Sequence, residues 1–187
     1  PFSVQDAETL ITALRRDWGV AQANYDAFRF FTGLRPSEQI ALVVSDYDRA
    51  NGVLSITKAR VDWSSDVTKN GEDRRVELCP RAVAILEAYL AWREWLIRKG
   101  HVNHDALFFT HDYRPIRDIG YPYDRWRKTL QRLPLRYRKP YTARHTSVSW
   151  NLMLGRNPLW GALQHGHRIA TMPSVYAAWV EGARECD

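Results

Sequence analysis

The sequence predicts an α+β domain that is mainly helical and carries a small three-stranded antiparallel sheet. Three observations support this fold class. Apolar residues recur at helical spacing in several segments, three short stretches rich in β-forming residues lie near the middle of the chain, and a tight-turn signal separates two of them. The 187 residues contain no repeats or low-complexity tracts, so we expect a single domain over residues 1–187.

Helix starts and ends are marked by residues that favour these positions. Ser3 with Asp6 matches a capping box, Gly33 suits a helix end, and Pro36 and Pro80 suit first turns. Apolar residues at helical spacing follow each start. The predicted helices cover residues 4–16, 20–31, a short segment from 36, and then 80–99, 123–133, 142–154, 158–164 and 173–180.

The predicted sheet is formed by three extended stretches. These are residues 53–57, 59–63 and 74–78, all rich in residues that favour strands. Asn70-Gly71, between the second and third stretches, is typical of the tight turn of a β-hairpin.

Composition excludes several classes of protein. No apolar run is long enough to span a bilayer, and no secretion signal opens the chain, so we expect no membrane partner. Two cysteines, Cys79 and Cys186, fit a reducing compartment better than a disulfide framework. Because the first residue is Pro1 and not Met, we expect a fragment or a processed product.

The positive charge is concentrated in one stretch. The net charge is +6, and between Arg114 and Arg144 ten cations are opposed only by Asp118 and Asp124. Such a block favours a polyanion such as DNA, although a solvated helix face is the alternative for a charge run taken alone. The candidate DNA-binding residues are Arg125, Arg127, Lys128, Arg136, Arg138 and Lys139.

The sequence lacks the motifs of the commonest cofactor and hydrolase sites. It has no glycine-rich phosphate loop and no nucleophile-elbow serine. The histidine pairs 101/104 and 165/167 lack the spacing of a closed zinc site, so we expect no metal and no cofactor.

Five polar residues at turns and helix starts remain as candidates for catalysis. Each is a weak signal alone, because such residues are more often solvated or structural. They are Arg35, Lys69, Arg144, His167 and Tyr176, in that order along the chain.

Together these five residues resemble the signature of the tyrosine recombinases, also called phage integrases, and the resemblance covers nearly the whole chain. The order arginine, lysine, arginine, histidine, tyrosine matches that family's catalytic domain. Arg144 and His167 are 23 residues apart, and His167 and Tyr176 are 9 apart, both typical of the family. The resemblance implies the tyrosine recombinase catalytic fold and a site-specific DNA recombinase or integrase from a phage or another mobile element.

The resemblance also implies a role for each residue. Arg35 and Arg144 would clamp the scissile phosphate, as the planar fork of a guanidinium allows. Tyr176 would attack the phosphate and form a covalent 3′-phosphotyrosyl link, and Lys69 would protonate the leaving 5′-oxygen. His167 would donate a hydrogen bond to the phosphate.

Four neighbours of these residues have roles of their own. Glu38 would orient Arg35, while Tyr141 stands where most members of the family have a histidine, so a catalytic and a structural role stay open for it. His145 follows Arg144 directly, so we expect a core or hydrogen-bonding role for it, and we expect His165 at the surface or at a helix cap.

The resemblance further implies double-stranded DNA as partner, a homotetramer on DNA, and a bacterial cytoplasmic protein that is nucleoid-associated when bound. The family's N-terminal core-binding domain is expected to be absent from this chain. Two alternatives stay open. One is a type IB topoisomerase or telomere resolvase, which shares the chemistry, and the other is a DNA-binding module that has lost activity.

Overall fold

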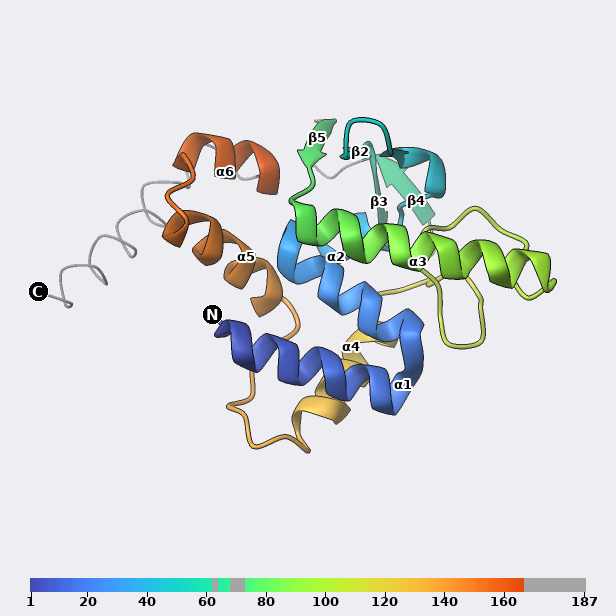
Figure 1. Ribbon diagram of the computed structural model, residues 1–187, viewed down its shortest axis with the longest axis horizontal. Helices are drawn as coiled ribbons and strands as arrows, with labels where there is room; N and C mark the ends of the chain where they lie inside the picture. The colour runs from blue at the N-terminus through green and yellow to red at the C-terminus, as the bar shows by residue number, and fades with distance from the viewer. Residues whose placement is uncertain (62–63, 68–72, 167–187) are drawn as a thin grey trace, which may run out of the picture.

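The computed structural model describes residues 1–61, 64–67 and 73–166. Its elements are α1 (Val4–Thr32), α2 (Pro36–Gln39), the 3-10 turn η1 (Val44–Asp46), β1 (Tyr47–Asp48), β2 (Val53–Ile56), β3 (Lys58–Val61), β4 (Ser64–Val67), β5 (Arg74–Glu77), α3 (Pro80–Arg98), α4 (Gly120–Leu130), α5 (Thr142–Met153) and α6 (Pro158–His165). In Figure 1 the strands lie on one side of α3 and α1 on the other, while α5 and α6 occupy one end of the molecule. The mainly helical fold class is confirmed.

The first two predicted helices form one element with a kink. Gly19 has φ 81° and ψ −174°, which interrupts α1 between the two predicted segments. Ser3 caps the start, since its Oγ accepts a hydrogen bond from the Asp6 N–H at 3.0 Å. Gly33, at φ 60°, ends the helix, and its N–H donates to the Arg29 carbonyl at 2.9 Å.

The three-stranded antiparallel sheet is confirmed, but its strands differ from those predicted. Its order is β1-β2-β5, and β3 pairs with β4 in a separate two-stranded hairpin. The described part of the predicted strand 59–63 lies in β3, so it does not supply the third strand, which is the two-residue β1. The predicted turn at Asn70-Gly71 and the predicted helix over 173–180 lie outside the described residues.

Two aromatic clusters form the core. Phe108 packs against Tyr25, Phe28 and Tyr89 where α1 meets α3. On the other side of α1, the Phe30 ring stacks on Trp126 of α4 at 5.8 Å and on Trp150 of α5 at 5.9 Å. α1 packs against α3, α4 and α5. This packing fixes the position of the end of α1 relative to the start of α5. No helix in the described ranges combines the length and apolar character needed to cross a membrane.

Candidate active site

Arg35 and Glu38 form a compact pair at the turn that follows α1. The Arg35 N–H donates to Glu38 Oε2 at 2.8 Å, and Arg35 Nη1 donates to Glu38 Oε1 at 2.8 Å. Pro36 occupies the first position of α2, where its missing N–H costs nothing. The Arg35 side chain stays one-third exposed while that of Glu38 is buried, so Glu38 holds the arginine from beneath.

Arg144 lies buried in the first turn of α5. Its Nη1 donates to the Gly33 carbonyl at 2.7 Å, and its Nη2 donates to the His165 carbonyl. Burial lowers the pKa of Arg144 to about 10, with the Arg35 and Arg74 charges lowering it and Tyr141 and Glu38 opposing them. The guanidinium therefore stays protonated at neutral pH, and its buried Nε has no hydrogen-bond partner in the described part of the chain.

The two predicted phosphate-binding arginines converge at the end of α6. Arg35 Nη2 donates to the Gly166 carbonyl, and Arg144 Nη2 donates to the carbonyl of the preceding residue, His165. Their contacts bring together residues that lie 131 and 21 positions apart in the chain. Arg35, Glu38 and Arg144 are thus one cluster, at the point where the chain continues into the predicted His167.

Arg74 of β5 belongs to the same cluster, although the sequence analysis did not identify it. Arg74 Nη1 and Nη2 donate to Glu38 Oε1 and Oε2 at 2.8 and 2.7 Å, which is a bidentate ion pair. Burial alone raises the pKa of Glu38, but hydrogen bonds and charge from Arg74 and then Arg35 outweigh it and hold that pKa below its ordinary value. One carboxylate therefore serves two guanidinium groups.

His165 is the last residue of α6, next to its C-cap Gly166, so of its two predicted positions, surface or helix cap, the surface is wrong. It is buried, not at the surface, and its Nδ1 lies 2.8 Å from the Gly161 carbonyl while its Nε2 lies 3.1 Å from Ser147 Oγ. A Cβ added to Gly33 would lie 2.3 Å from His165 Cδ2. The imidazole thus fills the space between α5, α6 and the end of α1.

Tyr141 lies at the edge of the cluster. It precedes α5, is 39% exposed, and its ring packs edge to face against His145 at 5.3 Å. His145 is itself exposed, so the core alternative for His145 is wrong, whereas the hydrogen-bonding alternative stays a prediction. The neighbouring Pro140 carbonyl accepts a hydrogen bond from buried Arg29 at 2.9 Å, which anchors the segment that leads into Tyr141.

Lys69, His167 and Tyr176, three of the five predicted catalytic residues, lie outside the described residues. Their predicted roles stay predictions. Within the described ranges, no group of three or more His, Cys, Asp or Glu side chains is placed to hold a metal ion.

The predicted DNA-binding residues fall into two groups. Arg127, Lys128, Arg136 and Lys139 are exposed. Arg125 is instead packed between rings, with its guanidinium carbon 3.4 Å from the Tyr121 ring centre and 5.2 Å from that of Trp18. Arg138 lies 4.4 Å over the Phe2 ring and pairs with Asp6 at 3.3 Å, so both arginines contribute to packing.

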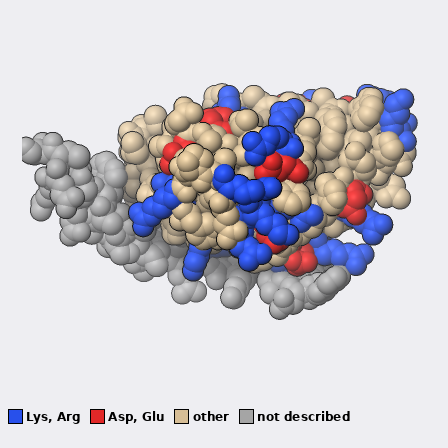
Figure 2. All heavy atoms as spheres, turned by 90° about the horizontal axis from the view of Figure 1, so that it is seen from below, with Lys and Arg blue, Asp and Glu red and all other residues tan. Residues whose placement is uncertain are grey.

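A shallow groove of about 450 Å³ is lined by Tyr141 and by two of the exposed cations, Arg127 and Lys139. Its lining residues are Gly120, Tyr123, Asp124, Arg127, Tyr137, Lys139, Pro140 and Tyr141. Figure 2, which views the molecule from below, shows Lys and Arg side chains gathered near the centre of that face with acidic side chains among them. Some of this charge is neutralised locally, because Asp124 pairs with Arg127 at 2.8 Å and with Lys128 at 2.7 Å.

The fold is similar to those of solved recombinase structures. The XerA recombinase matches 94% of this chain and 58% of its own at 22% identity, with a TM-score of 0.73. The Tn1549 transposon integrase in complex with circular intermediate DNA matches 98% of this chain and 66% of its own at 19% identity, with a TM-score of 0.77. The lambda integrase dimer bound to a core site gives a TM-score of 0.70 at 14% identity, over 94% of this chain and 58% of its own. These likenesses confirm the tyrosine recombinase catalytic fold.

Two curated relatives come from Escherichia coli (strain K12). IntQ, described as a defective protein, is 27% identical over 203 residues, which cover 96% of this chain and 50% of IntQ. The prophage integrase IntR is 24% identical over 199 residues, which cover 94% of this chain and 47% of IntR. The chain therefore spans about half the length of the curated relatives that it matches.

A comparison with protein families matches residues 2–178 to the phage integrase family. This match covers the turn of Arg35, the start of α5 at Arg144, and the predicted Lys69, His167 and Tyr176. It confirms the resemblance that these residues indicated, and the chain belongs to the phage integrase family.

Proposed function

We propose that this chain is the catalytic domain of a site-specific DNA recombinase that cuts and rejoins DNA through a covalent 3′-phosphotyrosyl intermediate. The observation that supports it best is the convergence of Arg35 and Arg144 on the consecutive carbonyls of Gly166 and His165. Family membership supports recombination as the general function, and the fold supports the catalytic-domain assignment.

The charge of the cluster suits a phosphodiester. Among the described residues it holds the guanidinium groups of Arg35, Arg74 and Arg144 and the carboxylate of Glu38, so positive charge is in excess. A phosphodiester carries one negative charge, which grows on its nonbridging oxygens during in-line attack. Preorganised guanidinium donors stabilise that charge most in a site sheltered from water.

The proposed steps assign one task to each residue. Arg35 and Arg144 hold the phosphate oxygens, and a guanidinium has more N–H donors than the carbonyl contacts of either arginine use. The Tyr176 phenol gives up its proton to water, attacks the phosphorus and displaces the 5′-oxygen, to which Lys69 gives a proton. His167 donates a hydrogen bond to the phosphate. The phosphotyrosyl bond keeps the energy of the broken linkage, so a 5′-hydroxyl can reverse the step without metal or nucleotide.

The wider assembly is also a proposal. Several solved structures of similar fold are complexes with DNA, which supports double-stranded DNA as the partner of this chain. We propose a tetramer on DNA and a bacterial cytoplasmic location. Tyr141 and the exposed residues along the groove contact the DNA in this proposal, because they line the same surface.

A suicide substrate tests the proposal. A DNA duplex nicked close to the cleavage site loses its short 5′-hydroxyl fragment after cleavage, so the covalent complex accumulates and survives denaturation. Wild-type chain should form this complex and Tyr176→Phe should not, while both bind the same duplex equally. Equal DNA binding without any covalent complex from the wild type would instead support a DNA-binding module that has lost activity. Relaxation of a supercoiled plasmid would identify a topoisomerase.

A further inference from the structure

Arg74 lies where three elements of the active site meet. It begins β5, directly after the segment that contains the predicted Lys69, and its fork reaches across to Glu38 of α2. Its Nε also donates to the Gln164 carbonyl of α6 at 3.3 Å. The side chain is only 12% exposed. All three guanidinium nitrogens of Arg74 donate to protein oxygens, whereas the Nε of Arg144 has no partner among the described residues, so Arg74 is less suited to bind phosphate itself.

The contacts around Gly166 extend this arrangement. A Cβ added to Gly166 would lie 3.0 Å from Arg35 Nη1 and 3.0 Å from the guanidinium carbon of Arg74. Gly166 has φ 60°, which favours glycine, and it directly precedes the predicted His167 in the chain. Both guanidinium groups therefore pack against the end of α6, with the Glu38 carboxylate joining them.

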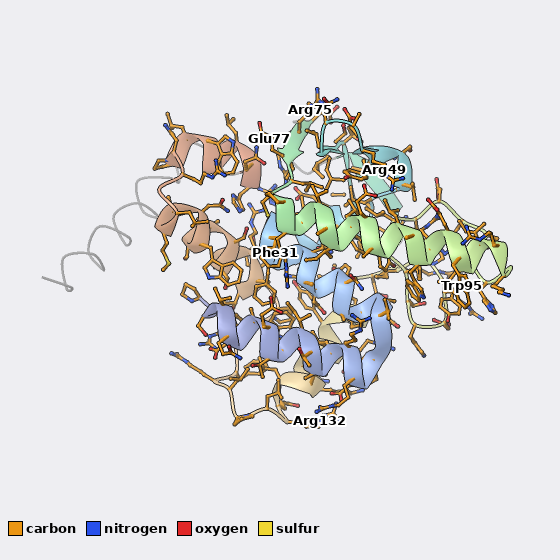
Figure 3. The ribbon with its side chains drawn as sticks, viewed as in Figure 1. Phe31, Arg49, Arg75, Glu77, Trp95 and Arg132 are labelled. Carbon is orange, nitrogen blue, oxygen red and sulfur yellow. The ribbon has the colours of Figure 1, made fainter. Side chains whose placement is uncertain are left out.

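A second set of contacts fixes β5 against α6. The Glu77 N–H donates to Gln164 Oε1 at 2.9 Å, and Trp160 Nε1 donates to Glu77 Oε2 at 3.4 Å. Figure 3 shows Glu77 between β5 and α6, whereas Arg75 points to the outer edge of the sheet. Adjacent residues of a strand point to opposite faces, so Arg74 faces the site and Arg75 does not.

We infer that Arg74 is a positioning residue that sets the geometry of Arg35 through Glu38 and links β5 to the end of α6. Without Arg74, Glu38 keeps only Arg35 as an ion-pair partner in the cluster, and α6 loses one of its links to β5. The inference rests on the proposed function, because it concerns the rate of phosphate attack at the same site.

The adjacent arginine provides a matched control. Arg75 belongs to the same strand, its side chain is 67% exposed, and it pairs only loosely with Asp48 at 3.6 Å. The experiment compares Arg74→Gln and Arg75→Gln with the wild type on the nicked suicide duplex. It measures the single-turnover rate of covalent complex formation, the Kd for the same duplex, and the melting temperature.

Arg74→Gln should slow covalent complex formation on the order of 10²-fold, the effect of a small misplacement of a reacting group. Its Kd for DNA should stay within about twofold of that of Arg75→Gln, because Arg74 does not contact the phosphate, and Arg75→Gln should keep the wild-type rate. A rate for Arg74→Gln equal to that of Arg75→Gln would overturn the inference. A parallel loss of rate, DNA affinity and melting temperature would also overturn it, since that pattern marks a merely structural role.

Arg74→Lys guards against a variant that does not fold. Lysine keeps the positive charge but cannot donate two parallel hydrogen bonds to one carboxylate. It should melt close to the wild type and still form the complex about tenfold more slowly, whereas a wild-type rate would overturn the inference. If the wild-type chain binds DNA but forms no complex, the proposed function fails and the inference falls with it. Failure of the Arg74 variants alone to slow the reaction leaves the proposed function standing.

Discussion

Gly33 and His165 lie so close together that a single added carbon on Gly33 would come within 2.3 Å of the imidazole Cδ2. The two residues belong to segments more than 130 positions apart. The Gly33 carbonyl and the His165 carbonyl are also the two acceptors of Arg144. The close approach of the end of α1 to the end of α6 therefore sets the distance between the two carbonyl oxygens that the Arg144 guanidinium bridges.

This contact makes Gly33 intolerant of a side chain. Gly33→Ala should lower the free energy of unfolding by about 3 kcal/mol, because left-handed backbone strain and overpacking against His165 add. Gly100→Ala is the matched control, since Gly100 also follows the end of a helix at positive φ but has nothing within 4 Å of an added Cβ. It should cost about 1 kcal/mol. Chemical denaturation measures both, and equal losses would show that the contact with His165 has no energetic weight.

The two phosphate-binding arginines should be irreplaceable by lysine. Arg35→Lys and Arg144→Lys should each slow covalent complex formation on the order of 10²–10³-fold, because an ammonium cannot reproduce the planar fork that holds two oxygens. Arg49→Lys, an exposed residue that pairs with Glu87, serves as control and should react at the wild-type rate. Single-turnover gels with the nicked duplex give the rates. A wild-type rate for Arg35→Lys would contradict the proposed clamp.

The free energy of unfolding should depend on pH because of Glu38. Its pKa is lower in the folded chain than the ordinary 4.5, so its ion pairs stabilise the fold fully above about pH 4.5, and this contribution is lost as pH falls below that value. Glu38→Gln should lower the free energy of unfolding by about 3 kcal/mol at pH 7, because it leaves buried guanidinium charge without its partner.

The difference between wild type and Glu38→Gln should shrink as pH falls below 4.5. Urea unfolding at a series of pH values measures it. Glu87→Gln, which removes a more exposed partner of Arg49, should cost about 1 kcal/mol or less at pH 7. A difference for Glu38→Gln that stays constant from pH 7 to pH 3 would show that the ionised carboxylate contributes nothing.

DNA affinity should distinguish the exposed cations from the packed ones. Lys139 is exposed and lines the groove beside Tyr141. Lys139→Ala should therefore lower the slope of log Kd against log salt concentration by about 0.9. Arg125→Ala should leave that slope unchanged and lower the melting temperature instead, because its guanidinium packs on Tyr121. Fluorescence anisotropy over a range of salt concentrations gives the slopes. The reverse pattern would place the DNA on another face.

Local sequence signals predicted most of the helices. Ser3, Pro36, Pro80 and Gly33 act through their own backbone geometry or nearest neighbours, so their effects can be read without knowing the fold. The sheet was harder to predict, because β1 has only two residues and gains its strand character from pairing with Leu54 and Val53. A strand of two residues is too short to show the alternation of apolar and polar residues that marks a strand in a sequence.

The active-site cluster was likewise predicted only in part from the sequence. The grouping of Arg35, Glu38 and Arg144 was predicted from the family resemblance, whereas Arg74 was missed. A signal for Arg74 existed: the period of two in a strand places it on the same face as Val76, which is buried. Similarly, Arg125 follows Tyr121 by four residues, the helical spacing at which side chains meet. Both signals indicate which side chains lie next to each arginine. A count of the charges in the sequence does not contain this information.

The sharing of Glu38 between Arg35 and Arg74 restricts how this sequence can diverge. Replacing the acid alone leaves two cations facing each other in a poorly hydrated space, and replacing either base alone leaves the acid with half of its compensation. Neutral drift at these three positions therefore requires concerted exchange. In distant descendants of this protein, the trio should be inherited intact or be rebuilt as a whole.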